Sequence, residues 1–178
     1  FTSWTGGGCT GTGPCTVTVN NNLNVTATFG VLRNRLTVVK TGTGVGTVTS
    51  LPVGISCGTD CTEDYLAGTA VVLTAVGNAT SSFTGWSGGG CTGTGPCTVT
   101  MDAVQTVSAS FAANSYSVTV AMNTAGNGVG TVASMPAGID CGTDCSESYL
   151  AGTPVVLTAT PGPDSVFAGW SGNCTGTA

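Results

Sequence analysis

The residues best suited to chemistry in this chain are its nine cysteines, which are not accompanied by a single histidine. Eight of them form close pairs, separated by three or by five residues: Cys57 and Cys61, Cys141 and Cys145, Cys9 and Cys15, Cys91 and Cys97. Zinc sites usually use pairs with about two to four intervening residues, often with histidine. Cysteine-dense secreted chains use such pairs as disulfides. We therefore expect disulfides rather than zinc, and an extracellular or cell-surface location.

The ninth cysteine, Cys174, belongs to an incomplete copy of a repeated motif. The sequence CTGTGPC occurs at 9–15 and again at 91–97, whereas the copy that begins at Cys174 reads CTGTA up to residue 178. We expect the partner of Cys174 to lie beyond residue 178, either in a longer array or on another chain.

The sequence shows no pattern typical of an enzyme. A serine or cysteine nucleophile needs a positioned base, commonly histidine, and none is present. Carboxylates cluster only around the C-x3-C pairs: Asp60, Glu63 and Asp64 in one copy, and Asp140, Asp144 and Glu147 in the other. Oxygen ligands in a turn can bind calcium, but the spacing matches no calcium loop and the two copies differ. We expect solvated loops, no cofactor and no enzymatic activity, with calcium as the weaker alternative.

Charge argues against nucleic acid as a partner, and the distribution of apolar residues argues against a membrane span in this chain. Only 6% of residues are charged, and the three basic ones, Arg33, Arg35 and Lys40, share one short segment. Neutralising a phosphate backbone takes many Lys and Arg contacts, so nucleic acid is excluded as a partner. No apolar run approaches the roughly 18–20 residues of a membrane span. With 40% hydrophobic residues, the chain is expected to be ordered.

Tryptophan marks an internal repeat. Trp4, Trp86 and Trp170 lie 82 and 84 residues apart in the similar stretches FTSWTGGGC, FTGWSGGGC and FAGWSGNC. A second motif recurs in step at 44–75 and 128–159. We therefore divide the chain into the C-terminal half of one repeat (1–34), a complete repeat (35–113) and the N-terminal part of a further one (114–178). This division into partial and complete repeats is expected of a segment taken from a long array of repeats.

Within each repeat the pattern indicates β-structure almost throughout. Apolar and polar residues alternate at 97–111, 16–29 and 36–50, each interrupted by a turn, which predicts hairpins with one buried face. No helical period is sustained, and at most one helical turn is expected at 62–68. A unit of this size has a thin core and often needs covalent staples. The sequence therefore predicts an all-β fold of small, disulfide-stapled modules of about 82–84 residues in an extended array.

The tryptophans allow two interpretations. Flat aromatic faces can stack on sugar rings, which favours a glycan-binding module. Phe83 and Trp86 are three residues apart, so in a regular strand they would face opposite sides. A bulge at Gly85 would bring both inward, and core packing is then the favoured role.

Glycosylation is a further hypothesis. Asn24, Asn78 and Asn173 match the short N-glycosylation pattern. Rows of Ser and Thr on the outward strand faces would also accept O-linked sugars, which would suit a surface with few charges.

The ordered motif set resembles the divergent internalin-B B-repeat family. It is carried by GTGVGTV (42–48), PVGISCGTDC (52–61), GTAVVLTA (68–75), FTGWSGGGCTG (83–93), CTVTM (97–101) and VSASF (107–111). The resemblance implies compact β modules of bacterial surface and secreted proteins, often in tandem and often attached to adhesins or enzymes. It implies no catalytic residues.

These observations favour a structural function. We expect a repeat region of a secreted or surface bacterial protein that forms an extracellular stalk, fibre or filament, like parts of adhesins. Its partners would be neighbouring repeats or copies of itself. The alternatives are a module that binds extracellular glycans or cell wall through its tryptophans, and an accessory region of a larger secreted hydrolase.

Overall fold

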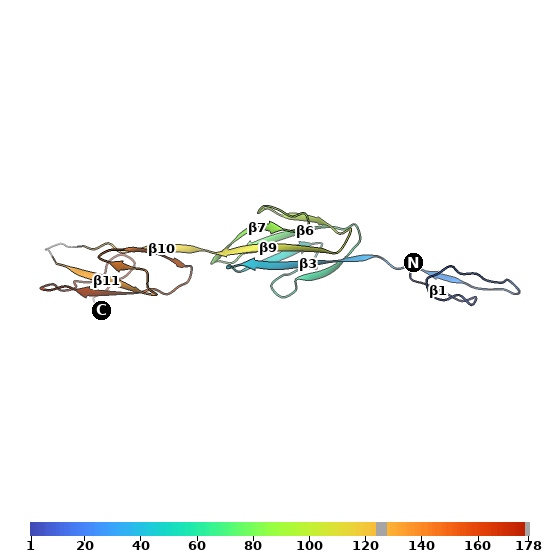
Figure 1. The fold of residues 1–178 in the computed structure, drawn as a ribbon, viewed down its shortest axis with the longest axis horizontal. Coiled ribbons are helices and arrows are strands. Elements are labelled where there is room, and N and C mark those ends of the chain that lie inside the picture. Colours follow the sequence, from blue (N-terminus) through green and yellow to red (C-terminus); the bar gives the residue numbers. More distant parts are fainter. Residues whose placement is uncertain (124–127, 177–178) are drawn as a thin grey trace. The chain divides into compact units, whose positions relative to one another are not determined.

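The computed structural model describes residues 1–123 and 128–176, and these residues form strands and loops without a helix (Figure 1). The expected all-β class is confirmed. The chain divides into two compact units. The first comprises residues 1–40, 47–75 and 85–109, and the second comprises 41–46, 76–84 and 110–178. The repeat boundaries derived from the sequence stay a prediction.

The strands are short, as alternating segments between glycine-rich turns predict. In chain order they are β1 (Ser3–Thr5), β2 (Thr26–Thr28), β3 (Arg33–Gly42), β4 (Gly46–Leu51), β5 (Thr62–Leu66), β6 (Ala70–Gly77), β7 (Ser81–Ser87), β8 (Cys97–Thr100), β9 (Gln105–Ala113), β10 (Ser115–Thr119), β11 (Gly130–Met135), β12 (Asp140–Cys141), β13 (Ser146–Leu150) and β14 (Val156–Pro161).

These strands form five small sheets. Two of them lie in the 33–113 region, with the orders β5-β3-β9-β7 and β4-β6-β8. The 115–161 region repeats part of this pattern with β10-β13 and β12-β11-β14, and the N-terminal region contains only the pair β1-β2. Among the described residues, β14 and β10 are therefore edge strands, whereas β6 and β3 are central.

Both sheets of the first unit bury alternate residues, the pattern of two sheets that share one core. Val48, Val71, Leu73 and Val99 from the three-stranded sheet are no more than 1% exposed. Leu36 of β3 is completely buried as well. Burial of a side chain of this size stabilises the fold by about 1.5–3 kcal/mol.

Strand pairing differs from the hairpins expected at 97–111 and 36–50. Strands β8 and β9 belong to different sheets, and so do β3 and β4. Alternation shows which face of a strand is buried but not which strand lies beside it. The loop between β8 and β9 carries the chain from one sheet to the other, so both strands still direct apolar side chains into a core. At most one helical turn was expected at 62–68. Residues 62–66 instead form β5 and pair with β3.

The second unit has its own small core. Val132, Ile139 and Cys141 are buried, and partly buried apolar side chains pack around them: Val118, Val120, Cys145, Tyr149, Leu157, Ala159 and Trp170. β11 pairs with β14 over six residues, from Gly130 opposite Pro161 to Met135 opposite Val156. β10 pairs with β13 in the same antiparallel manner.

A close approach of the chain to Phe111 requires glycine in the 41–46 segment. A Cβ atom at Gly46 would overlap the ring of Phe111, and one at Gly42 would overlap its carbonyl oxygen. Gly42 also has a φ of 90°, which side chains rarely adopt. The "GTGVG" stretch is thus a packing requirement, because Phe111 is 1% exposed.

Candidate functional site

The structure contains a disulfide within each of the four close cysteine pairs: Cys9–Cys15, Cys57–Cys61, Cys91–Cys97 and Cys141–Cys145. Cys174 is free and exposed. Each bridge closes a loop of only a few residues, and in the complete repeat three of the four half-cystines are buried (Cys57, Cys91 and Cys97). The cysteines therefore act as local staples of turns.

The acidic turns use their carboxylates to hold backbone amides. Asp60 accepts a hydrogen bond from the amide of Thr62 at 3.2 Å, and Asp144 accepts one from Ser146 at 3.1 Å. Such side-chain bonds to a backbone N–H two residues ahead stabilise turns. In the part of the chain that the structure describes, no three His, Cys, Asp or Glu side chains gather as metal ligands would.

Asp64 forms an ion pair across the strands β3 and β5. Arg35 donates from Nε to Oδ1 at 2.9 Å and from Nη2 to Oδ2 at 3.0 Å. This hydrogen bonding lowers the pKa of Asp64 below its ordinary value of 3.8 and raises the pKa of Arg35. Both side chains are largely exposed, at 60% and 45%, so water screens the pair and it adds little to the stability of the fold.

Each complete CTGTGPC loop is attached to the tryptophan that precedes it. The indole N–H of Trp86 donates to the carbonyl of Gly95 at 2.7 Å, and the backbone N–H of Trp86 donates to Gly93 at 2.9 Å. Trp4 makes the same two bonds to the loop at 9–15. The disulfide, the Gly-rich loop and the indole therefore form one local unit.

The burial of the tryptophan follows from an unusual backbone at Gly85. This residue has a φ of 151°, outside the range that side chains favour. Trp86 is 6% exposed, and Phe83 is partly buried with its ring 5.3 Å from that of Phe111. Gly169, the equivalent residue before Trp170, has a φ of 136°. Phe167 and Trp170 likewise pack together, with ring centroids 5.0 Å apart.

The sequence analysis did not predict a hydroxyl network that is present in both repeats. The hydroxyls of Ser50 and Tyr65 lie 2.7 Å apart, and Ser50 also accepts from the amide of Ile55 at 2.9 Å. Ser134 and Tyr149 reproduce the arrangement, again at 2.7 Å. The signal that could have found it is the recurrence of Ser and Tyr at matching places in both copies. The network shows that residues 130–150 are folded as residues 46–66 are.

The second unit contains a large cleft lined by both apolar and uncharged polar side chains. It has a volume of about 780 Å³ and is lined by residues between Ser117 and Cys174. The apolar side chains that line it come from β10, β11 and β14, from residues beside these strands, and from the tryptophan segment: Val118, Val120, Val132, Val155, Leu157, Ala159, Phe167 and Trp170. None of the residues lining it is charged. It is referred to below as the 117–174 cleft.

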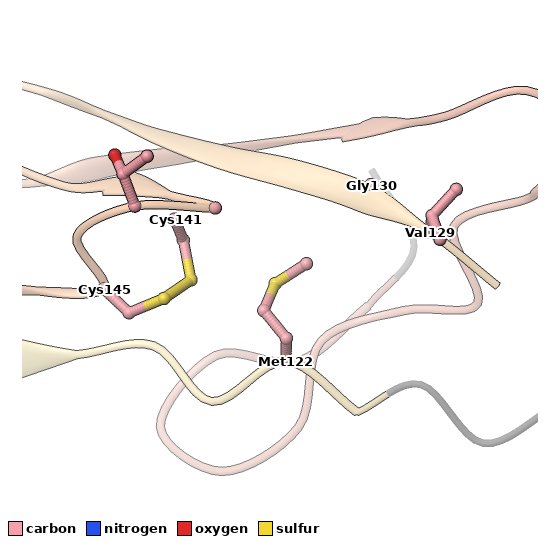
Figure 2. Close-up of a pocket in the computed structure, with 7 residues that line it drawn as sticks. Met122, Val129, Gly130, Cys141 and Cys145 are labelled. Atoms are coloured by element: carbon pink, nitrogen blue, oxygen red, sulfur yellow. A yellow bond between two sulfur atoms is a disulfide. The ribbon is translucent and has the colours of Figure 1, made fainter. Parts of the chain in front are cut away.

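A smaller hollow of about 310 Å³ lies beside the Cys141–Cys145 disulfide. Figure 2 shows the side chain of Met122 between this disulfide and residues Val129 and Gly130. Its lining is apolar apart from Thr143 and backbone groups, and it offers no acid, base or nucleophile. We assign it no chemistry.

The fold is that of a tandem β-repeat protein. Its recurring Cys, Trp, Ser and Tyr residues stabilise turns or pack in the cores. A family model described as the divergent InlB B-repeat domain matches residues 36–115 and 118–178, and the chain belongs to this family. The family is associated with bacterial surface proteins. No curated protein and no solved structure matches the chain. Among the described residues, no helix has the length and apolar character of a membrane span.

Proposed function

We propose that the chain is a structural repeat region of a secreted or surface bacterial protein and that it forms an extracellular stalk, fibre or filament. The observation that carries this proposal is the recurrence of one disulfide-stapled β unit with the same internal bonds. The Ser50–Tyr65 network and its copy at Ser134–Tyr149 agree in partners and in distance. Modules that repeat in this way contact mainly their neighbours, so that length grows with their number.

The residues that could have carried catalysis or ligand binding have structural partners in this proposal. The carboxylate of Asp60 accepts a hydrogen bond from a backbone amide, and that of Asp64 pairs with Arg35. Trp86 is 6% exposed, and its indole N–H is bonded to Gly95. These contacts support a scaffold over glycan binding, because a sugar needs an accessible aromatic face.

The proposal is tested by measuring length against repeat number. Chains with one, two and four copies of residues 35–113 would be compared by small-angle X-ray scattering. We expect the maximum dimension to rise by a constant increment per repeat. A maximum dimension that grows only with the cube root of mass would contradict the proposal, because it would mean that the repeats pack into a globule.

The glycan alternative has a separate test. Tryptophan fluorescence would be followed while cell-wall polysaccharide is added, with Trp86→Phe as the matched variant. Under the structural proposal the emission does not change. A saturable quench that disappears in Trp86→Phe would favour the binding module instead.

A further inference from the structure

The turn between β6 and β7 contains a modification motif that the stalk proposal does not use. Asn78, Ala79 and Thr80 match the N-glycosylation pattern, and they lie inside the complete repeat. All three residues are exposed. A transferase can attach a sugar only to an asparagine that it can reach, and the turn meets this first requirement.

Thr80 holds the side-chain amide of Asn78 by its oxygen. The Oδ1 atom of Asn78 accepts a hydrogen bond from the backbone N–H of Thr80 at 3.0 Å and a second one from the Thr80 hydroxyl at 3.1 Å. Among the described residues, none accepts a hydrogen bond from Nδ2 of Asn78. The nitrogen that would carry the sugar is therefore not engaged in the fold.

The second copy of the repeat forms the same turn from other residues. It reads GPDS at 162–165 where the complete repeat reads NATS at 78–81. In both turns the amide of the fourth residue donates to the carbonyl of the first at 3.2 Å. In both, the serine hydroxyl accepts from the amide of a valine, Val45 at 2.9 Å and Val129 at 3.0 Å. The turn therefore closes without Asn and Thr, and its closure does not explain why Asn78 and Thr80 are present.

We propose that Asn78 is an N-glycosylation site, and that it receives a sugar whose C1 atom is activated by a diphosphate. Nδ2 attacks C1, so that a bond between Nδ2 and C1 forms while the bond between C1 and the diphosphate oxygen breaks. The diphosphate leaves with the electron pair of that bond, and a base of the transferase takes the proton that Nδ2 loses. This inference goes beyond the proposed function and holds whether or not the repeats form a stalk.

Thr80 prepares the amide for this step. The lone pair of an amide nitrogen is shared with the carbonyl group, so Nδ2 is a weak nucleophile until it loses a proton. As the proton leaves, negative charge develops on Oδ1, to which Thr80 already donates two hydrogen bonds. Donors that are in place where charge develops stabilise the transition state. The hydroxyl of Thr80 is therefore part of the site.

The test is mass spectrometry of the protein produced by its natural host. Peptides that contain Asn78 should carry the added mass of one or more sugars. Alkaline β-elimination, which releases sugars from Ser and Thr hydroxyls, should leave this mass in place. Peptides with unmodified Asn78 alone would overturn the proposal, and so would an added mass that alkali removes.

The size of the added group distinguishes the two sources of activated sugar. A single hexose indicates a nucleotide-sugar donor, whereas an oligosaccharide of uniform composition indicates a donor assembled on a lipid diphosphate. Both donors activate C1 through a diphosphate, so both results support the site at Asn78.

Matched variants produced in the same host separate the site from the turn. Asn78→Gly introduces the residue that the second copy has at this place, so the turn should form and the modification should be lost. Thr80→Ser should keep the modification, and Thr80→Val should lose it, because valine has the shape of threonine without its hydroxyl. Thermal melts of the unmodified variants should agree, which shows that the loss does not come from unfolding. Modification of Asn78 that persists in Thr80→Val would overturn the proposal.

Discussion

At the scale of single residues, Trp86 connects the loop at 91–97 to the core. Its indole N–H donates to Gly95, while its ring is 6% exposed. Trp86→Phe keeps most of the ring and loses the bond, and should lower the free energy of unfolding by about 1 kcal/mol. Trp86→Ala should cost about 3–5 kcal/mol. Urea unfolding followed by circular dichroism measures both, and equal losses would show that the bond, not the packing, matters.

Gly46 is required by the volume of a neighbouring ring. Gly46→Ala places a methyl group into the ring of Phe111, and should lower the free energy of unfolding by about 1–3 kcal/mol. Gly95→Ala is the matched control, because no atom lies within 4 Å of an added Cβ there. Thermal melts measure the stability of both variants. A control as unstable as Gly46→Ala would argue against the overlap as the cause.

The Arg35–Asp64 pair predicts a small acid-sensitive contribution to stability. The folded pKa of Asp64 lies below its ordinary value of 3.8 because of Arg35. The contribution is therefore present above pH 3.8 and is lost as the pH falls through the folded pKa. Melting temperatures between about pH 7 and pH 2 should fall less steeply for Asp64→Asn than for the unchanged chain. Parallel curves would show that screening removes the effect.

At the scale of elements, the short disulfide loops hold strand ends in place. Removing the bridge beside β8 by Cys91→Ala with Cys97→Ala should lower the free energy of unfolding by about 2 kcal/mol in the chain-entropy model. Cys174→Ser is the control, since that cysteine is exposed and free, and should leave stability unchanged. The denaturant midpoints of both variants, measured without reductant, show whether only the loss of the bridge lowers stability.

The existence of strands was predictable at this scale, but their pairing was not. Val99 and Met101 alternate with threonines as expected, and both are buried. The following strand buries Val107 and Phe111 in the same way. Alternation is a local property of the chain. Whether two such strands pair or enter separate sheets depends on the direction of the loop and on the shape of the shared core, neither of which leaves a period in the sequence.

At the scale of the whole molecule, the oxidation state of the cysteines is the property that tests the proposed location. Alkylation of the denatured but unreduced chain should add one label, at Cys174, and alkylation after reduction should add nine. Mass spectrometry counts the labels. Protein taken from its native source with nine reactive thiols before reduction would contradict an extracellular location, because such bridges persist only in oxidising compartments.

The candidate site was predictable in its parts and not in its arrangement. The Trp motif, the cysteine pairs and the glycine before each tryptophan recur along the sequence, and Gly85 has a φ of 151° next to the buried Trp86. The hydrogen bond from the indole to Gly95 was not visible, because it depends on the path of the loop. The 117–174 cleft could not be predicted either, since its residues belong to four separate segments.

The all-β class, the repeat, the family and the close cysteine pairs could be predicted from the sequence, because all of these depend on local spacing and on recurrence along the chain. The entry of β8 and β9 into different sheets, and the places of β10 and β14 at sheet edges among the described residues, became known only from the fold. Only the tertiary structure, likewise, brought Ser50 and Tyr65 together. These features depend on which distant segments lie side by side, and that choice is made by burying a common core rather than by any single stretch of residues.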